Sequence, residues 1–269
     1  MKVLMIGAGN MGFTFAEGLI ASNTIKKGNL LIFDKNIALT EKLGQDERFT
    51  TYKNLDEAVV AAHIIFIAVK PHHSEDLFKE IKPHLKTDHI IVSLMAGVTL
   101  EFMQASTSLS KIVRAMPNLP AKVGKGVTAF TETKGVSKIE QITIRNLLDS
   151  TGIAIHVANE DFINKSTAIS GSGPAYVFYF MQSMFEAAQK MGFSANDSKV
   201  LISNTFEGAV QLFKDSDLSP IGWINKVASK GGTTEAAIDS MRDNDVSAKI
   251  KEAAYAAFER AVELGQENQ

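Results

Sequence analysis

The sequence predicts an α/β fold, with a parallel sheet flanked by helices in the first part of the chain and helices alone in the second. Three observations lead to this prediction. Short, continuously apolar segments alternate with helical patterns up to residue 158, as expected for strands buried on both faces of a parallel sheet. After Asn159 only helical patterns follow. The length of 269 residues suits two domains, which we expect at residues 1–159 and 160–269.

The expected strands are rich in Ile, Leu and Val, and helical patterns or turn residues separate them. They are Val3–Ile6, Leu30–Phe33, Ile64–Val69, Ile90–Leu94 and Ile112–Ala115, extended by Gly126–Thr131 and Ile153–Val157. The helices expected between them are Met11–Ala21, Ile37–Leu43, Leu55–Ala61, Ser74–Ile81, Leu100–Gln104 and a helix near Ser137–Ser150. In the second part the expected helices are Phe162–Met191, Ala195–Phe213, Thr234–Met241 and Val246–Glu263.

Composition narrows the classes of function. The net charge of −2 gives no global basic field for nucleic acid or an anionic membrane. The absence of cysteine excludes disulfides, thiolate metal sites and cysteine nucleophiles. The glycines at positions 7, 9 and 12 interrupt the N-terminal apolar run before a signal peptide could form, and no run of about 18 apolar residues is present. We therefore expect a cytoplasmic protein with neither a nucleic-acid nor a membrane partner.

The segment Gly7-Ala-Gly9-Asn-Met-Gly12 follows the first expected strand and opens the first expected helix. In this context the GxGxxG pattern indicates a Rossmann-type dinucleotide-binding domain, with a glycine-rich structural turn as the alternative. Gly7 permits the tight turn, Gly9 lets the backbone approach a pyrophosphate, and Gly12 lets helix and strand pack closely. The helix N-terminus, at Asn10 and Met11, offers unpaired N–H groups to the phosphates.

Asp34 is the acidic residue expected near the end of the second strand, 22 positions after Gly12. A carboxylate there favours the 2′-hydroxyl of NADH and repels the 2′-phosphate of NADPH. Lys35 is adjacent and suits that phosphate instead. The two residues leave the choice between NADPH and NADH open.

Further cofactor contacts are expected where later strands end, because ligands of open α/β sheets lie outside the carboxyl ends of the strands. The segments at these ends are Ala68-Val69-Lys70-Pro71, Met95-Ala96-Gly97 and Met116-Pro117-Asn118. Lys70 either contacts a phosphate or ribose or is a solvated lysine before a proline turn.

The residues that many dehydrogenases need are missing. No tyrosine is followed by lysine at the fourth position, and all six histidines lie within residues 63–156. His72 and His73 form the only close pair, which lacks the i, i+4 spacing of a helical zinc site, so we expect both to face solvent and we expect no metal. A protonated imine relaxes the need for a general acid, since hydride can add to carbon once the substrate is correctly oriented.

Two motifs of the helical part remain to be explained. In Ser170-Gly-Ser-Gly-Pro174-Ala-Tyr176 the proline predicts a break or a new helix start. Its glycines either allow close helix packing or form a floor beneath the nicotinamide. Ser229–Asp239 is a loop that enters a helix, and Thr233 or Thr234 suits the N-cap. It is either a plain capped helix or a cradle for a carboxylate, where N–H groups, two hydroxyls and a helix dipole converge.

These motifs together resemble the pyrroline-5-carboxylate reductase family over essentially the whole chain. The resemblance rests on the GxGxxG loop, Ala68–Pro71, Met116–Asn118, Ser170–Tyr176 and, as the most specific signature, Val227-Ala-Ser-Lys-Gly-Gly-Thr-Thr-Glu-Ala236. It implies NAD(P)H-dependent reduction of Δ1-pyrroline-5-carboxylate to L-proline, the last step of proline biosynthesis. It also implies a Rossmann domain followed by a helical domain that forms homodimers, which in this family often assemble further into rings.

The resemblance also implies roles for individual residues. Gly231, Gly232 and Thr233 would hold the substrate carboxylate through backbone N–H groups, and Thr234 would lie at the ring nitrogen. Ser229 and Asp217 are further candidates near the substrate.

The chain departs from the family pattern at two positions. The family usually has proline at the position of Lys230, and it usually prefers NADPH with a basic or small polar residue at the position of Asp34. Two alternatives compete with this assignment. A β-hydroxyacid dehydrogenase would need a lysine shortly after the glycine motif, whereas the next lysine after Gly173 is Lys190. A non-catalytic dinucleotide sensor would need no substrate loop.

Overall fold

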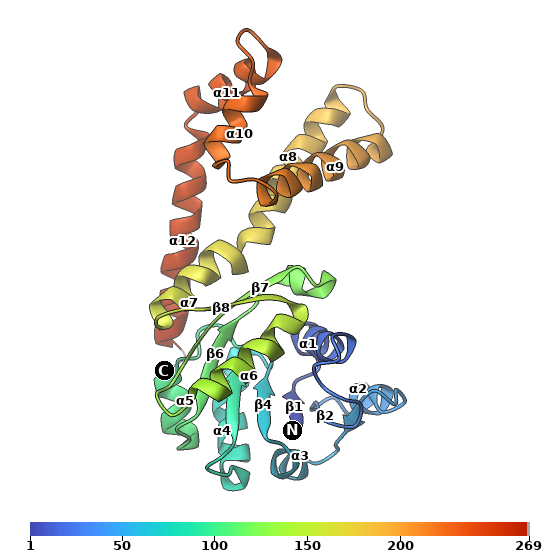
Figure 1. Cartoon of the computed structure of the whole chain (residues 1–269), viewed down its shortest axis with the longest axis vertical. Helices are drawn as coiled ribbons and strands as arrows, with labels where there is room; N and C mark the ends of the chain where they lie inside the picture. The colour runs from blue at the N-terminus through green and yellow to red at the C-terminus, as the bar shows by residue number, and fades with distance from the viewer. Residues whose placement is uncertain (268–269) are drawn as a thin grey trace. The chain divides into compact units, whose positions relative to one another are not determined.

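The chain folds around one eight-stranded sheet with the strand order β3-β2-β1-β4-β5-β6-β7-β8. We describe residues 1–267 of a computed structural model (Figure 1). The strands are β1 Val3–Ile6, β2 Leu30–Phe33, β3 Thr50–Thr51, β4 Ile64–Ile67, β5 Ile90–Ser93, β6 Ile112–Met116, β7 Gly126–Glu132 and β8 Gly152–His156. β1 lies between β2 and β4, and its first residue, Val3, pairs with Leu30 of β2 and with Ile64 of β4.

The sheet is parallel except at one pair. β6 and β7 run antiparallel, with Val113 opposite Glu132 and Met116 opposite Ala129. The expectation of a parallel sheet is therefore wrong at this pair. The short 3₁₀ turn η3, Leu119–Val123, is the only helical connection between the two strands. A parallel crossover needs about a dozen residues, so this short link lets β7 return directly alongside β6.

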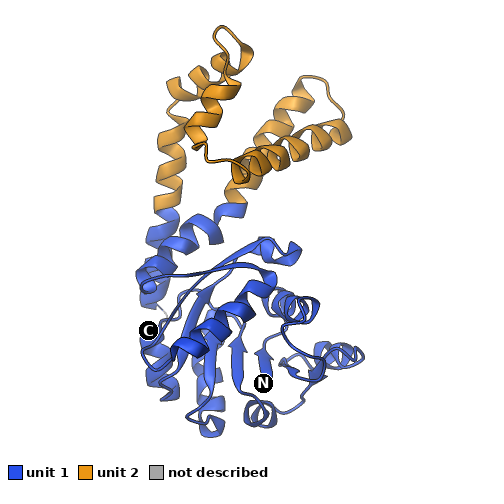
Figure 2. Ribbon diagram, in the orientation of Figure 1, with its two compact units in different colours: residues 1–174, 256–269 blue, residues 175–255 orange. Residues whose placement is uncertain are grey.

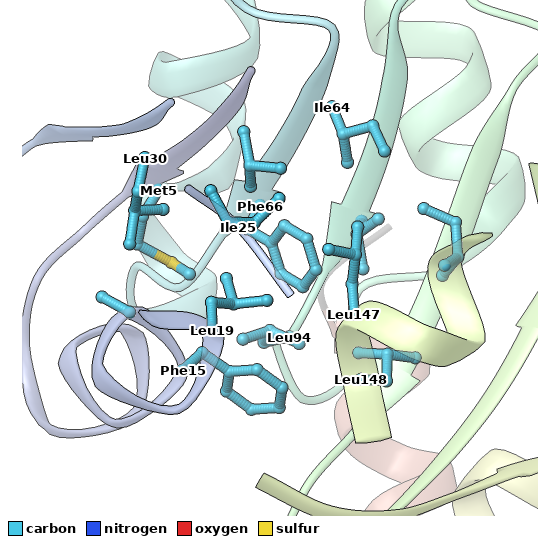
Figure 3. Packing of buried hydrophobic residues seen from close by; sticks show 14 of the residues in the cluster. Met5, Phe15, Leu19, Ile25, Leu30, Ile64, Phe66, Leu94, Leu147 and Leu148 are labelled. Carbon is cyan, nitrogen blue, oxygen red and sulfur yellow. The ribbon is translucent and has the colours of Figure 1, made fainter. Parts of the chain in front are cut away.

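Helices cover both faces of the sheet, as the sequence predicts. Alternate residues of β1 point to opposite faces. Val3 and Met5 pack in a cluster with α1, and Leu4 and Ile6 pack in a second cluster with α3, α4 and α5. Figure 3 shows the first cluster, where Phe15 and Leu19 of α1 face Phe66 of β4. The helices of this part are α1 Asn10–Ala21, α2 Ile37–Leu43, α3 Leu55–Ala61, α4 Ser74–Ile81, α5 Leu100–Thr107, α6 Lys138–Leu148 and α7 Glu160–Ser166, with 3₁₀ turns η1 Pro71–His73, η2 Lys82–His84 and η4 Asp149–Thr151.

A buried arginine connects α7 to the sheet. Arg114 of β6 is 2% exposed and donates to Glu160 at 2.8 Å and to Asn164 at 3.0 Å, both in α7. The same Glu160 oxygen accepts the N–H of Leu100 at the start of α5, at 2.9 Å. Because the ion pair is largely removed from water and each partner has further hydrogen bonds, it fixes the position of α7 on the sheet.

The remainder of the chain is helical. It contains the π-helical turn η5 Thr167–Gly171 and helices α8 Gly173–Lys190, α9 Ala195–Lys214, α10 Pro220–Val227, α11 Thr233–Asp243 and α12 Val246–Glu267. The predicted helix Phe162–Met191 is thus broken into α7, the π turn and α8, at the position where Pro174 predicts a break or new start. β3 and α10 are absent from the sequence-based prediction.

By contacts between residues the chain divides into two compact units, coloured in Figure 2. Unit 1 consists of residues 1–174 and 256–269, and unit 2 consists of Ala175–Tyr255. These boundaries lie inside α8 and α12. Compact units are not the same as sequence domains, so the division at residues 159/160 remains a prediction. The expected end of the second domain, at residue 269, lies beyond the described residues.

Candidate functional site

A cavity of about 300 Å³ lies where the strand order reverses, beside the carboxyl ends of β1, β2 and β4. This switch point is where open α/β sheets bind their ligands. Seven of the predicted cofactor residues line the cavity: Gly7, Gly9, Asp34, Lys35, Ala68, Val69 and Lys70. The geometry therefore brings together three segments that are far apart in the sequence.

The three glycines of the GxGxxG loop differ in the space around them. Gly7 has a φ of +91°, and a Cβ there would lie 2.9 Å from the Ala68 carbonyl oxygen. At Gly12 a Cβ would lie 1.9 Å from the Gly7 carbonyl oxygen. Nothing lies within 4 Å of a Cβ built on Gly9. Gly7 and Gly12 thus let the strand, the turn and α1 approach each other, while Gly9 leaves its space open for a phosphate.

The start of α1 suits an anion. Gly9 is the N-cap, makes no side-chain capping bond, and its carbonyl accepts the first helical N–H, from Phe13 at 2.9 Å. The N–H groups of Asn10 and Met11 precede this first bond, so the helix itself provides no acceptor for them. With the open space at Gly9, they form a cradle that fits a dinucleotide pyrophosphate.

Asp34 supports the loop as well as lining the cavity. Its two carboxylate oxygens accept the N–H of Ala8 at 2.7 Å and the N–H of Asn36 at 2.8 Å. One bond ties the end of β2 to the glycine loop, and the other shapes the entry into α2. The carboxylate keeps further lone pairs for a ribose hydroxyl. Its backbone contacts give Asp34 a structural reason to be acidic whichever cofactor binds.

Two lysines and a histidine surround Asp34 in the cavity. Lys35 is exposed, with its ammonium 3.8 Å from the Glu80 carboxylate, and Lys70 is exposed at the entry to η1. His73 also lines the cavity and was not predicted there, although it is exposed as expected. The sequence contains a signal for this position. His73 follows Lys70 by three residues in a 3₁₀ turn that begins at Pro71, and residues three apart in such a turn lie on the same side.

The other predicted cofactor residues lie outside this cavity's lining. Met11 and Gly12 lie in α1, Pro71 begins η1 after β4, Ala96 and Gly97 follow β5, and Pro117 and Asn118 follow β6. Of these, Gly12, Gly97, Pro117 and Asn118 are buried. Gly97 has a φ of +72°, which suits its place in the turn between β5 and α5. Asn10 and Gly9 also line a second cavity, of about 610 Å³, which follows α1 between α2 and η3.

Asn118 joins two of the motifs found in the sequence. Its side-chain oxygen accepts the N–H of Val127 at 2.9 Å, and its side-chain amide donates to the Ser170 carbonyl at 3.0 Å. The loop after β6 is thereby bonded to β7 and to the π turn that precedes α8. In the same place a Cβ on Gly171 would lie 3.1 Å from the Met116 methyl group, which supports the packing interpretation for this glycine.

The segment Ser229–Asp239, the candidate substrate motif, begins with a tight turn. The N–H of Gly232 donates to the Ser229 carbonyl at 2.9 Å, which closes a four-residue turn with Lys230 and Gly231 in its centre. Gly231 has a φ of +74°, and Lys230 is not among the residues with positive φ. This combination defines a type II turn, whose second position favours proline and whose third position favours glycine. Lys230 therefore occupies the position of the family's usual proline with a compatible backbone.

α11 begins at Thr233, with Gly232 as its N-cap. The expectation of Thr233 or Thr234 at the N-cap is therefore wrong, because the turn carries the extended backbone of the N-cap to Gly232. The Glu235 carboxylate accepts the N–H of Gly231 at 2.6 Å. Among residues 1–267 the structure gives no hydrogen-bond acceptor for the N–H groups of Thr233 and Thr234.

Thr234 also lines an apolar cavity of about 270 Å³ in unit 2, together with Trp223, Ile224, Val227 and Ile238. The predicted residues Ser229 and Asp217 are both exposed, Ser229 in the turn and Asp217 between α9 and α10. Next to Asp217, the Ser216 hydroxyl accepts the indole N–H of Trp223 at 3.1 Å. The cofactor cavity belongs to unit 1 and the substrate motif to unit 2.

The sheet topology, the glycine loop and the anion cradle define a class of protein, the NAD(P)-dependent oxidoreductases with a Rossmann-type domain. Residues 2–97 match the family model described as NADP oxidoreductase, coenzyme F420-dependent. Residues 160–264 match the model described as pyrroline-5-carboxylate reductase dimerisation. A pyrroline-5-carboxylate reductase from Pseudomonas aeruginosa is 32% identical over 267 residues, covering 99% of this chain and 97% of that protein. The chain belongs to the pyrroline-5-carboxylate reductase family.

Solved structures agree with this assignment. A pyrroline-5-carboxylate reductase from Coxiella burnetii has 30% sequence identity and a TM-score of 0.91 over 98% of both chains. A pyrroline carboxylate reductase from Plasmodium falciparum with NADP bound has 29% identity and a TM-score of 0.88 over 98% of both chains. Within residues 1–267 no helix of this chain is long and apolar enough to cross a membrane.

Proposed function

We propose that this chain reduces the C=N bond of Δ1-pyrroline-5-carboxylate with NAD(P)H and releases L-proline. The observation that carries the proposal is the family relationship over almost the whole length of both chains, which includes the segment Ser229–Glu235. The type II turn at its start and the unpaired amides at the start of α11 give this segment the groups that a carboxylate needs.

The proposed cofactor contacts come from the strand ends of unit 1. The N–H groups of Asn10 and Met11 hold the pyrophosphate at Gly9, while Asp34, Lys35, Lys70 and His73 surround the adenosine ribose. The bound cofactor supplies a hydride to the imine carbon. Ala96, Gly97, Pro117 and Asn118 continue the cleft along the strand ends.

The proposed substrate contacts come from the substrate motif. The amides of Gly231, Thr233 and Thr234 hold the carboxylate, and the Thr234 hydroxyl orients the ring nitrogen. The N–H of Gly232 closes the turn that presents these groups. A protonated imine already carries positive charge, so hydride addition needs orientation more than a strong general acid. This explains why a helical part without histidine suffices for the reaction. Ser229 and Asp217 contribute at the edge of the site.

Assembly supports the same proposal. Within unit 2 only Ser198 and Ile202 are buried, whereas large apolar side chains of α8, α9 and α10 are exposed in the single chain. Helices with uncovered apolar faces need a partner surface. We propose a homodimer through the helical part, with further assembly of dimers into a ring, in the cytoplasm.

The experiment is a steady-state assay of the purified full-length protein with pyrroline-5-carboxylate and either NADPH or NADH. Oxidation of one cofactor with formation of proline is the expected result. Lack of turnover with both, despite cofactor binding, would favour a non-catalytic sensor. Thr234→Ala should lower kcat about ten-fold or more, with the cofactor Kd unchanged, because it removes an orienting group and leaves unit 1 intact. An unchanged kcat would remove Thr234 from the site.

A further inference from the structure

The first turn of α11 contains an internal carboxylate at one of the proposed substrate donors. Glu235 occupies the third position of the helix, from which a glutamate usually bonds back to the N–H of the N-cap residue. Here the N-cap N–H, that of Gly232, already donates to Ser229 in the turn. Glu235 instead reaches one residue further and accepts the N–H of Gly231 at 2.6 Å.

This bond changes the set of donors that the motif offers. Gly231 donates to Glu235 and Gly232 donates to the Ser229 carbonyl, while within the described chain the amides of Thr233 and Thr234 have no protein acceptor. The Gly232 bond closes the turn, so breaking it would unfold the motif. The Gly231 bond is to a side chain, which can rotate away without any change in the backbone.

We infer that Glu235 determines how tightly the substrate site binds carboxylates, because its own carboxylate competes with theirs for the Gly231 N–H and repels them. The inference rests on the proposed function of this motif. A site that first has to release an internal ligand binds an external one more weakly, in proportion to the fraction of released molecules. Glu235 thereby weakens the binding of the substrate and of the product L-proline alike, and it favours release of the product.

The surroundings of Glu235 offer a matched control. Asp239 lies one turn further along α11, is exposed, and forms an ion pair with Arg242 at 2.9 Å. Asp239→Asn removes one negative charge from the same helix without touching the turn. Glu235→Gln removes the charge and keeps an amide oxygen at the same place, whereas Glu235→Ala removes both.

The test compares wild type, Glu235→Gln, Glu235→Ala and Asp239→Asn by steady-state kinetics and by calorimetric titration of L-proline into the enzyme with NADP⁺. For Glu235→Gln, the KM for pyrroline-5-carboxylate and the Kd for L-proline should both fall about three- to ten-fold, because a neutral amide oxygen competes for the Gly231 N–H more weakly than a carboxylate and no longer repels the ligand. kcat should stay within about two-fold, unless release of L-proline limits turnover, in which case kcat falls. Asp239→Asn should match wild type.

Two kinds of result would contradict the inference about Glu235, and they can be told apart. A KM and Kd that stay equal or rise in Glu235→Gln, with the thermal transition unchanged, would show that Glu235 serves only to cap the helix. If Glu235→Ala loses stability, Glu235→Gln alone decides the question, since it preserves the side-chain shape. A wild type that neither turns over the imine nor binds L-proline overturns the proposed function, and the inference with it. A working wild type with an unresponsive Glu235→Gln overturns the inference alone.

Discussion

The two compact units differ in how far each has buried its own apolar residues. In unit 1 every residue of β1, β2, β4 and β5 is buried, and alternate side chains of β1 belong to clusters on both faces of the sheet. In unit 2 the helices α8, α10 and α11 contain no buried residue at all. α8 exposes Val177, Phe178, Tyr179 and Phe180 in succession.

This difference indicates which unit carries each function. A unit with a finished core can hold a glycine loop in a fixed geometry, which binding of a dinucleotide requires. A unit with uncovered apolar helices reaches its final structure only against another surface, so any site within it depends on assembly. Cofactor binding should therefore be a property of unit 1, and binding of the imine a property of the assembled enzyme.

The largest effect is expected from Gly12→Ala, in the glycine loop of unit 1. The new methyl group would lie 1.9 Å from the Gly7 carbonyl oxygen, so the backbone of the loop must move. We expect a loss of about 3 kcal/mol in the free energy of unfolding and loss of detectable NADPH binding, measured by urea titration and by cofactor fluorescence. Gly9→Ala, where no atom lies within 4 Å, should cost about 1 kcal/mol or less in stability. Equal losses in both variants would contradict this account.

An intermediate effect is expected from Phe178→Glu, on the exposed apolar face of α8 in unit 2. Phe178 is 60% exposed in the single chain, so the charge costs little there and much in an apolar interface. The free energy of dimerisation should weaken by about 2–4 kcal/mol, measured by sedimentation, while the Kd for the cofactor stays unchanged. Lys27→Glu, on the exposed surface of unit 1, should leave assembly intact. A variant that remains dimeric would place the interface on other side chains.

The smallest effect is expected from His89→Asn, which tests the core of unit 1 by pH. His89 is 1% exposed, and burial lowers the pKa of its imidazole from the usual value. The unfolded chain therefore binds a proton at a pH where the folded chain does not, so stability falls as the pH drops below about 6.5. Asn keeps an acceptor for the N–H of Lys86 and has no proton to bind. The Tm of the variant should decrease less than that of wild type between pH 7.5 and pH 5.5; an equal decrease in both would exclude His89 as a cause.

Much of the fold could be predicted because it is encoded locally. Continuous apolar runs located β1 and β2 to the residue, since strands buried on both faces leave no other pattern. The two-residue strand β3 is too short to give a pattern. The eight residues of α10 make only about two helical turns, so Ser219 and Pro220, which are typical helix-start residues, are its clearest signal. The antiparallel direction of β7 could not be predicted, because an apolar run carries no information on direction.

The candidate site was predictable to a different extent in each unit. The glycine loop and Asp34 follow from spacing, and they lie together because parallel strands end at the same edge of the sheet. The bonds from Asp34 to Ala8 and from Glu235 to Gly231 are not encoded in any spacing rule, since both depend on rotamers chosen after the backbone has folded. The same holds for Asn118, whose amide joins two motifs 52 residues apart.

The single tryptophan of the chain makes the two units separable by spectroscopy. Trp223 lies in unit 2, where its indole donates to Ser216, the Lys226 ammonium lies 5.0 Å from its ring centre, and Thr234 shares its cavity. Unit 1 contributes no tryptophan, so its unfolding appears in the far-ultraviolet circular dichroism without a matching change of indole emission. Indole emission that depends on protein concentration would therefore report the association of the helices around Trp223, separately from unit 1.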